Sequence, residues 1–250
     1  MNEPKTKIVA TLGPASASRE VLRDMMLSGM DVCRLNFSHG SYDFYTELIA
    51  TIRLLNAELG RTTAILADLQ GPKLRVGAME NGPIQLKDGD LLTITTDELL
   101  GKPGLVSTSY KQFPQDVKPG ELVLLDDGKL RLEVVGTDSR TEVSDPGAAR
   151  RDAQRNKGIN LPNTRVSLPC LTPKDRADLD FALENDVDWV GLSFVRSARD
   201  IIELKGVIQQ REKHARVIAK IEKPEALNGH RHHLHASRAH GRRHRPSRPS

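Results

Sequence analysis

The sequence predicts an α/β protein whose parallel sheet is interrupted by a small all-β domain. Short, almost continuously apolar runs alternate with segments of helical periodicity, which is typical of parallel strands covered by helices. Between residues 76 and 156 this alternation gives way to short β runs. Turn dipeptides such as Asp88-Gly89 and Pro119-Gly120 separate these runs, which indicates an inserted β domain.

The first part of the α/β region contains three predicted strands and two predicted helices. The strands are expected at residues 8–12, 30–37 and 63–69. Ser18 can cap the first helix, at about residues 19–27, and Gly29 can stop it. The second helix has apolar residues on one face and ends at Gly60; these residues are Phe44, Leu48, Ile52, Leu55 and Leu59.

The α/β pattern resumes after the β insert. Thr172 is a helix cap followed by Pro173 at the first helical position. The remaining elements are a strand at residues 187–194, a helix at 197–210 and a strand at 216–222. Residues 144–156 lack periodicity and are predicted to form a surface loop, or to be a second stretch of locally corrupted sequence. Five β/α units interrupted once are therefore expected.

Charge and cysteine usage exclude several classes of protein. Residues 228–250 hold six arginines and no acid. Without them the formal net charge of the chain falls from +4 to about −2, so the excess of positive charge is confined to this segment. This argues against a nucleic-acid-binding fold.

Cys33 and Cys170 are too far apart in sequence for a typical metal motif, and we expect reduced, buried thiols. No segment reaches the ~20 apolar residues of a membrane span, so a soluble cytoplasmic protein is expected.

Polar side chains follow all five predicted strands, at the edge of the sheet where α/β active sites are built. The main charged ones are the cations Arg34, Arg75 and Lys220 and the carboxylates Asp68 and Glu222. Cations suit phosphoryl oxygens and carboxylates suit Mg²⁺, so the pattern favours phosphoryl transfer. The alternative is that the loops are polar only because they are solvated. No Walker loop or GxGxxG motif is present.

Five ordered motifs resemble the pyruvate kinase family. They span residues 7–16, 34–40, 68–75, 157–162 and 219–225. The resemblance implies an α/β fold based on a (β/α)8 TIM barrel, here incomplete with about five strands, and an inserted small all-β barrel domain that acts as a mobile lid. The expected organisation is barrel residues 1–75, β lid 76–156, barrel residues 157–227 and a disordered basic tail 228–250.

The resemblance also implies a reaction: phosphoryl transfer between phosphoenolpyruvate and ADP, giving pyruvate and ATP in glycolysis. Arg34 would contact the phosphoryl group, Lys220 would stabilise the enolate-like transition state, and Glu222 would bind Mg²⁺ or Mn²⁺. The family's monovalent-cation site matches Asn36, Ser38, Asp68 and the main chain of Leu69. Its substrate and nucleotide contacts match Arg34, Asn36, His39, Arg75 and Lys157.

Lys73 stands where potassium-dependent members carry an acidic residue. An ammonium group in that pocket would supply the positive charge that K⁺ brings. We therefore expect catalysis without added K⁺ in the intact parent enzyme.

The family pattern stops after Leu227, which suggests a truncated or frame-shifted sequence. The segment with the second Mg²⁺ ligand and the C-terminal domain of the family's homotetramer would then be missing. We expect an incomplete barrel and negligible turnover by this chain. The alternative is a non-catalytic product whose Arg/His tail binds nucleic acid or a metal. The tail has neither aromatics between its arginines for base stacking nor a fixed His spacing for a metal, so a binding tail is the weaker hypothesis.

Overall fold

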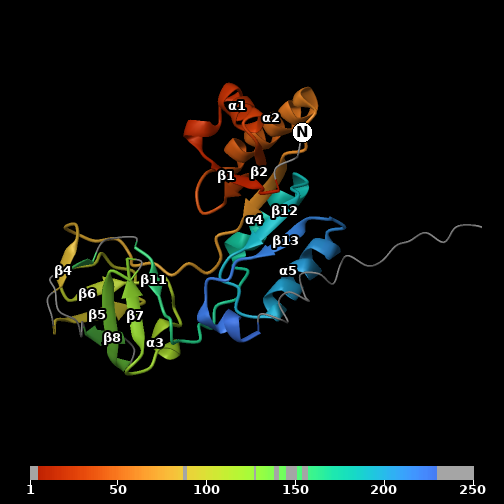
Figure 1. Cartoon of the computed structure of the whole chain (residues 1–250). Helices are drawn as coiled ribbons and strands as arrows, with labels where there is room; N and C mark the ends of the chain where they lie inside the picture. The colour runs from red at the N-terminus through yellow and green to blue at the C-terminus, as the bar shows by residue number, and fades with distance from the viewer. Residues whose placement is uncertain are drawn as a thin grey trace, which may run out of the picture. The chain divides into compact units, whose positions relative to one another are not determined.

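The computed structural model describes residues 5–86, 89–126, 128–137, 141–144, 151–153 and 157–229. The chain divides into two compact units. The first, here called the α/β unit, comprises Met1–Pro72 and Cys170–Ser250, and the second, the β unit, is Lys73–Pro169. Figure 1 shows the elements of the α/β unit in red to orange and in cyan to blue, and those of the β unit in yellow to green.

A five-stranded parallel sheet forms the centre of the α/β unit, in the order β1-β2-β3-β12-β13. Its strands are β1 (Ile8–Leu12), β2 (Met30–Asn36), β3 (Ala64–Asp68), β12 (Trp189–Leu192) and β13 (Arg216–Ala219). The predicted α/β class with a parallel sheet is confirmed. The sheet is open rather than closed into a barrel, because β1 and β13 are its two edges.

Helices connect successive strands of this sheet (Figure 1). They are α1 (Arg19–Leu27), α2 (Tyr42–Leu59), α4 (Pro173–Glu184) and α5 (Ala198–Gln210), with short 3-10 helices η1 (Pro14–Ser16) and η2 (Pro224–Gly229). The predicted cap residues act as caps: the Ser18 hydroxyl accepts the N–H of Val21, and Gly60 takes a left-handed conformation with φ 60°.

The hydrophobic core of the α/β unit lies between the sheet and these helices. Apolar side chains of β2 and β3 pack with those of α1, α2, α4 and α5. Since each crossover between neighbouring parallel strands is right-handed, the helices cover the same face of the sheet. Because all five strands are parallel, their carboxyl ends lie at one edge of the sheet.

The β unit is built around a six-stranded sheet, in the order β11-β7-β8-β9-β5-β6, and a separate β10-β4 pair. The elements are β4 (Ile84–Leu86), β5 (Leu91–Thr95), β6 (Leu105–Ser107), α3 (Phe113–Asp116), β7 (Leu122–Leu125), β8 (Leu130–Thr137), β9 (Thr141–Ser144), β10 (Arg151–Ala153) and β11 (Ile159–Asn160). This unit has a hydrophobic core of its own, which includes Leu92, Val123 and Leu132.

Three predictions about segment boundaries differ from the structure. The β unit spans Lys73–Pro169 rather than 76–156, because β11 pairs with β7 and Leu161 packs in the core of the β unit. Within the predicted loop at 144–156, β10 pairs with β4; residues 145–150 and 154–156 lie outside the described residues. The predicted tail begins inside η2, and its residues 230–250 lie outside the described residues.

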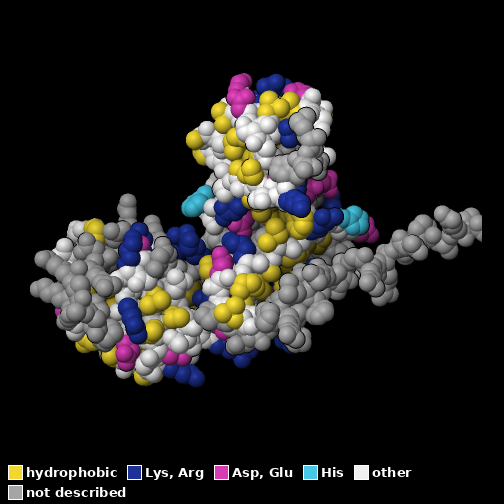
Figure 2. Space-filling model, in the orientation of Figure 1, with side chains coloured by type: hydrophobic (Ala, Val, Ile, Leu, Met, Phe, Trp, Pro, Cys, Tyr) yellow, Lys and Arg dark blue, Asp and Glu magenta, His cyan; other side chains and the backbone are white. Residues whose placement is uncertain are grey.

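Both edges of the parallel sheet expose apolar side chains. On β1, Ile8 is 51% exposed and Val9 53%. At and just after β13, Ile218 is 38% exposed and Ile221 45%. Figure 2 shows hydrophobic side chains at the surface over β12 and β13. Separately, none of the helices in the described part of the chain is long and apolar enough to cross a membrane.

Candidate active site at the carboxyl edge of the parallel sheet

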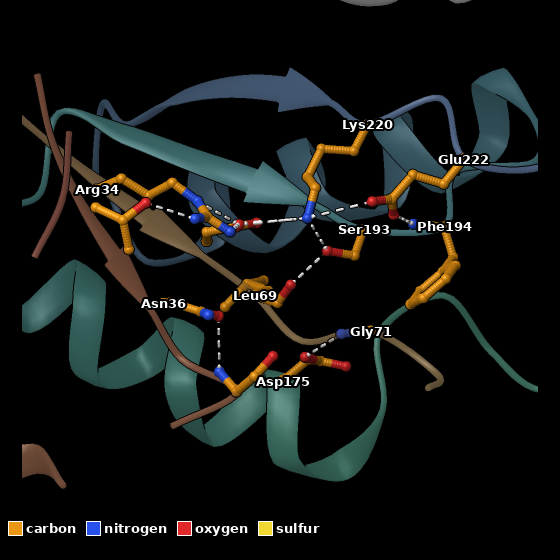
Figure 3. A network of polar contacts seen from close by, with 12 residues as sticks. Arg34, Asn36, Leu69, Gly71, Asp175, Ser193, Phe194, Lys220 and Glu222 are labelled. Atoms are coloured by element: carbon orange, nitrogen blue, oxygen red, sulfur yellow. Dashed lines mark hydrogen bonds and ion pairs between the residues drawn. The ribbon is translucent and has the colours of Figure 1, made fainter. Parts of the chain in front are cut away.

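A buried carboxylate lies at the centre of the polar side chains at this edge. Asp68, the last residue of β3, is 3% exposed. Arg34 of β2 and Lys220, directly after β13, both form ion pairs with it: Arg34 Nη2 lies 2.5 Å from Asp68 Oδ2, and Lys220 Nζ lies 3.1 Å from Oδ1 (Figure 3). A buried charge is tolerated only when it is paired in this way. The sheet thus brings together three residues predicted from sequence.

Arg34 is oriented by two neighbouring strands. Its Nε donates to Asp68 at 2.7 Å, and its Nη1 donates to the hydroxyl of Thr11 on β1 at 2.6 Å. The side chains of Arg34 and Lys220 remain 31% and 29% exposed. Because a guanidinium has five N–H groups, Arg34 keeps donors for an anionic ligand arriving from solvent.

Lys220 contacts two further acceptors. Its Nζ donates to the hydroxyl of Ser193 at 2.8 Å and lies 3.5 Å from Glu222 Oε1. Ser193 directly follows β12, and sequence reasoning gave it no role. Only the packing of β3, β12 and β13 beside one another reveals its contact with Lys220.

Glu222 is held by the main chain that follows β12. Its Oε2 accepts the N–H of Phe194 at 3.0 Å. Phe194 has φ 55°, a left-handed conformation that is uncommon and strained for a bulky residue. This turn ends β12 two residues before the predicted end at 194 and aims the N–H at the carboxylate. Close by, burial lowers the pKa of Lys223, whose ammonium lies 5.9 Å from the Phe194 ring.

Asp175 supports the floor of the site, a role that sequence reasoning missed. It takes part in the capping box with Thr172 at the start of α4, and its Oδ1 also accepts the N–H of Gly71 at 2.9 Å. Gly71 has φ 69°, and a Cβ there would lie 2.9 Å from the Phe194 ring. The capping pattern was visible in the sequence, but the long-range hydrogen bond was not.

The residues matched to a monovalent-cation site lie on β2, β3 and the loops that follow them. Asn36 and Asp68 are register partners in the sheet. Asn36 Oδ1 accepts the N–H of Ser38 at 3.2 Å, and the carbonyl of Leu69 accepts the Ser193 hydroxyl at 2.6 Å. His39 is exposed in the same loop as Ser38. Arg34 and Lys220 already neutralise Asp68 without an added ion.

Arg75, Lys157 and Lys73, the other predicted site residues, belong to the β unit. Arg75 and Gly158 form a β-bridge, which brings Arg75 beside the backbone next to Lys157. Lys157 Nζ lies 2.9 Å from Asp126 Oδ1, and this hydrogen bond, with that of Lys129, lowers the pKa of Asp126. Lys73 is exposed at the start of the unit.

A divalent-metal site is only partly built by the residues that the structure describes. Those residues contain no group of three or more His, Cys, Asp or Glu side chains that could hold a metal ion. Glu222 can supply one carboxylate, whereas Asp68 is engaged by its two cations. The two cysteines, Cys33 and Cys170, are free and buried, as predicted.

The parallel sheet, with cations and carboxylates at its carboxyl edge, defines an α/β protein of the class that binds anionic substrates at the ends of its strands. The sequence profile described as "Pyruvate kinase, barrel domain" matches residues 3–239. The chain belongs to the pyruvate kinase family. This match runs past Leu227, where the sequence motifs predicted that the resemblance stops.

Several proteins named pyruvate kinase are similar to most of the chain. The one from Geobacillus stearothermophilus is 42% identical over 229 residues, which is 89% of this chain and 38% of the relative. That from Agrobacterium vitis is 44% identical over 234 residues, 90% of this chain and 47% of the relative. "Pyruvate kinase 2" of Synechocystis is 44% identical over 230 residues. The chain spans less than half the length of these relatives.

Proposed function

We propose that this chain carries the phosphoryl-binding part of a pyruvate kinase active site, which acts on phosphoenolpyruvate and ADP. The observation that carries the proposal is the shared pairing of Arg34 and Lys220 with the buried Asp68. This pairing holds two partly exposed cations at the carboxyl edge of the sheet. Their remaining N–H groups suit the oxygens of a phosphoryl group, whose negative charge is neutralised during transfer.

The two cations have different tasks in this proposal. Arg34 binds phosphoryl oxygens through the donors that Asp68 and Thr11 leave available. Lys220 places its ammonium near the oxygen that gains negative charge as the bond to phosphorus breaks, and so stabilises the enolate. Asn36 and His39 are the proposed nucleotide contacts of the α/β unit. Arg75 and Lys157, by the resemblance, are proposed nucleotide contacts within the β unit.

Mg²⁺ or Mn²⁺ would supply charge neutralisation on the phosphoryl group, and Glu222 is the proposed protein ligand. A single carboxylate gives weak metal binding, and the described residues offer no complete donor set. We therefore propose that the chain binds phosphoenolpyruvate but has negligible turnover.

The charge pattern supports a site that needs no monovalent cation. Arg34 and Lys220 are balanced by Asp68 and Glu222. The identity of Lys73, as the resemblance implies, points the same way. Phosphoenolpyruvate binding is therefore expected to stay the same when K⁺ is replaced by a bulky organic cation at equal ionic strength. Calorimetric titrations in the two salts measure this; loss of binding without K⁺ would contradict it.

Binding experiments with substitutions at the centre of the site test the main proposal. Lys220→Met and Arg34→Met are each expected to weaken phosphoenolpyruvate binding about ten-fold or more, because each removes a charge-assisted contact to the ligand. Isothermal titration calorimetry measures the dissociation constant, and a coupled assay of pyruvate formation measures turnover.

Lys7→Met is the matched control for these substitutions. Lys7 also forms an ion pair with an aspartate, Asp31, at 3.0 Å, but just before β1 at the opposite end of the sheet. The Lys7→Met substitution should leave the dissociation constant for phosphoenolpyruvate unchanged. Equal affinities for the Lys220→Met, Lys7→Met and unmodified chains would refute the proposed function.

A further inference from the structure

We propose that Ser193 is a positioning residue that holds the Lys220 ammonium beside Asp68. The positioning itself rests on geometry alone, whereas its catalytic meaning rests on the proposed function. Ser193 directly follows β12 and is 2% exposed. Its hydroxyl oxygen lies between the carbonyl of Leu69 at 2.6 Å and Lys220 Nζ at 2.8 Å (Figure 3).

The direction of these two hydrogen bonds is determined by their chemistry. A serine hydroxyl has one hydrogen, and the Leu69 carbonyl can only accept, so that hydrogen goes to Leu69. The ammonium of Lys220 can only donate, so Ser193 offers it a lone pair. Leu69 is itself tied to β12, because its N–H donates to the carbonyl of Gly191 at 3.0 Å. The acceptor for Lys220 is thereby fixed to two adjacent strands.

Two glycines leave the space that this arrangement needs. A Cβ at Gly71 would lie 3.0 Å from the Cβ of Ser193, and a Cβ at Gly191 would lie 3.0 Å from Asp68 Oδ1. Such distances are too short for ordinary packing. The positions of Ser193 and Asp68 around Lys220 therefore depend on close backbone approach, which glycine permits.

Lys220 is consequently held from three directions. Asp68 lies at 3.1 Å, Ser193 at 2.8 Å and Glu222 at 3.5 Å from its Nζ. The contact to Glu222 is longer than a charge-assisted hydrogen bond, which is typically about 2.7–2.9 Å. Without the hydroxyl of Ser193, the ammonium would lose the shortest of its three contacts.

Chemical labelling of Lys220 in the full chain tests this inference without relying on turnover. Ser193→Ala is expected to raise the acetylation rate of Lys220 by limiting acetic anhydride about three-fold or more, because the amine loses one of its acceptors. Mass spectrometry of the Lys220 peptide gives the rate, and Lys7 in the same molecule is the internal reference. Ser193→Thr, which keeps the hydroxyl, should restore slow labelling.

Two further variants separate positioning from a general loss of structure. Ser193→Cys preserves volume but offers a weak acceptor, so it should also raise the rate. Thr63→Val removes another buried hydroxyl of the same unit, one that donates to the Met30 carbonyl, and should leave the labelling of Lys220 unchanged. Unchanged Lys220 labelling in both Ser193→Ala and Ser193→Cys would overturn the inference.

The labelling experiment and the binding experiment test the two proposals separately, so either proposal can fail while the other stands. If Ser193→Ala speeds labelling but Lys220→Met leaves phosphoenolpyruvate binding intact, the positioning stands and the proposed function falls. If labelling is unaffected while Lys220→Met abolishes binding, the function stands and Ser193 serves only the Leu69 carbonyl.

Discussion

At the scale of single residues, the site depends on one buried carboxylate that two cations share. Asp68 is almost fully buried, and removing either Arg34 or Lys220 would leave its charge only half compensated. Breaking a buried ion pair is strongly destabilising because the remaining partner has lost its hydration. Substitutions in this cluster will therefore affect stability as well as ligand binding, and both need measuring.

The two buried cysteines give a prediction about pH. Burial raises the pKa of both thiols from the ordinary thiol value of 9.0 to about 12. Cys33 and Cys170 are therefore expected to react with Ellman's reagent at mildly alkaline pH only after denaturation. Because the unfolded thiols ionise first, the free energy of unfolding should fall as pH rises from about 9 towards 12.

Thiol titration with and without denaturant, and urea unfolding across that pH range, measure these effects. Fast reaction of both thiols in the folded chain would show that Cys33 and Cys170 are accessible to solvent and would contradict this prediction.

At the scale of elements, helix α4 begins with a capping box that also supports the site. The hydroxyl of Thr172 accepts a hydrogen bond from the N–H of Asp175. The Asp175 carboxylate in turn accepts hydrogen bonds from the N–H groups of Thr172 and Gly71. The start of α4 is thus tied to the loop after β3. The cap therefore contributes to the shape of the site as well as to the stability of the helix.

Thr172→Ala is expected to destabilise the chain by about 1 kcal/mol, the usual cost of losing an N-cap hydroxyl. Urea denaturation followed by circular dichroism gives the change in free energy of unfolding. Thr172→Ser keeps the oxygen and should be close to neutral. A serine variant as unstable as the alanine variant would assign the effect to the lost methyl group instead.

The sequence predicted the strands and helices of the α/β unit well because their apolar runs and caps are local signals. The first helix and the strand at 8–12 match the structure residue for residue. Strands β6, β9, β10 and β11 have only two to four residues each, and none of them was predicted as a strand. The contacts of Ser193 and Asp175 arise from chain segments far apart in sequence, which local patterns cannot indicate.

At the scale of the whole molecule, the parallel sheet has two edge strands with exposed apolar side chains. Unpaired N–H and C=O groups along such edges are templates for association with other chains. Their apolar side chains add a hydrophobic contribution to that association. The chain is therefore expected to self-associate as its concentration rises.

Val9→Lys and Ile218→Lys are expected to reduce this self-association, because each places a charge on an edge strand. Sedimentation velocity over a range of concentrations measures it. The matched control is Leu54→Lys, which replaces a side chain of similar exposure, 57%, on helix α2 away from both edges. Concentration-independent monomers in the unmodified chain would contradict this view of the edges.

The contacts around Lys220 also have a kinetic consequence. Lys220 and Asp68 are 152 residues apart in sequence, and Ser193 and Leu69 are 124 apart, with the whole β unit between β3 and β12. Contacts between such distant segments form slowly, because a long loop must be closed before they contribute. Folding of the β unit beforehand would shorten that loop. The cluster around Asp68 is therefore expected among the last parts of the chain to form during refolding.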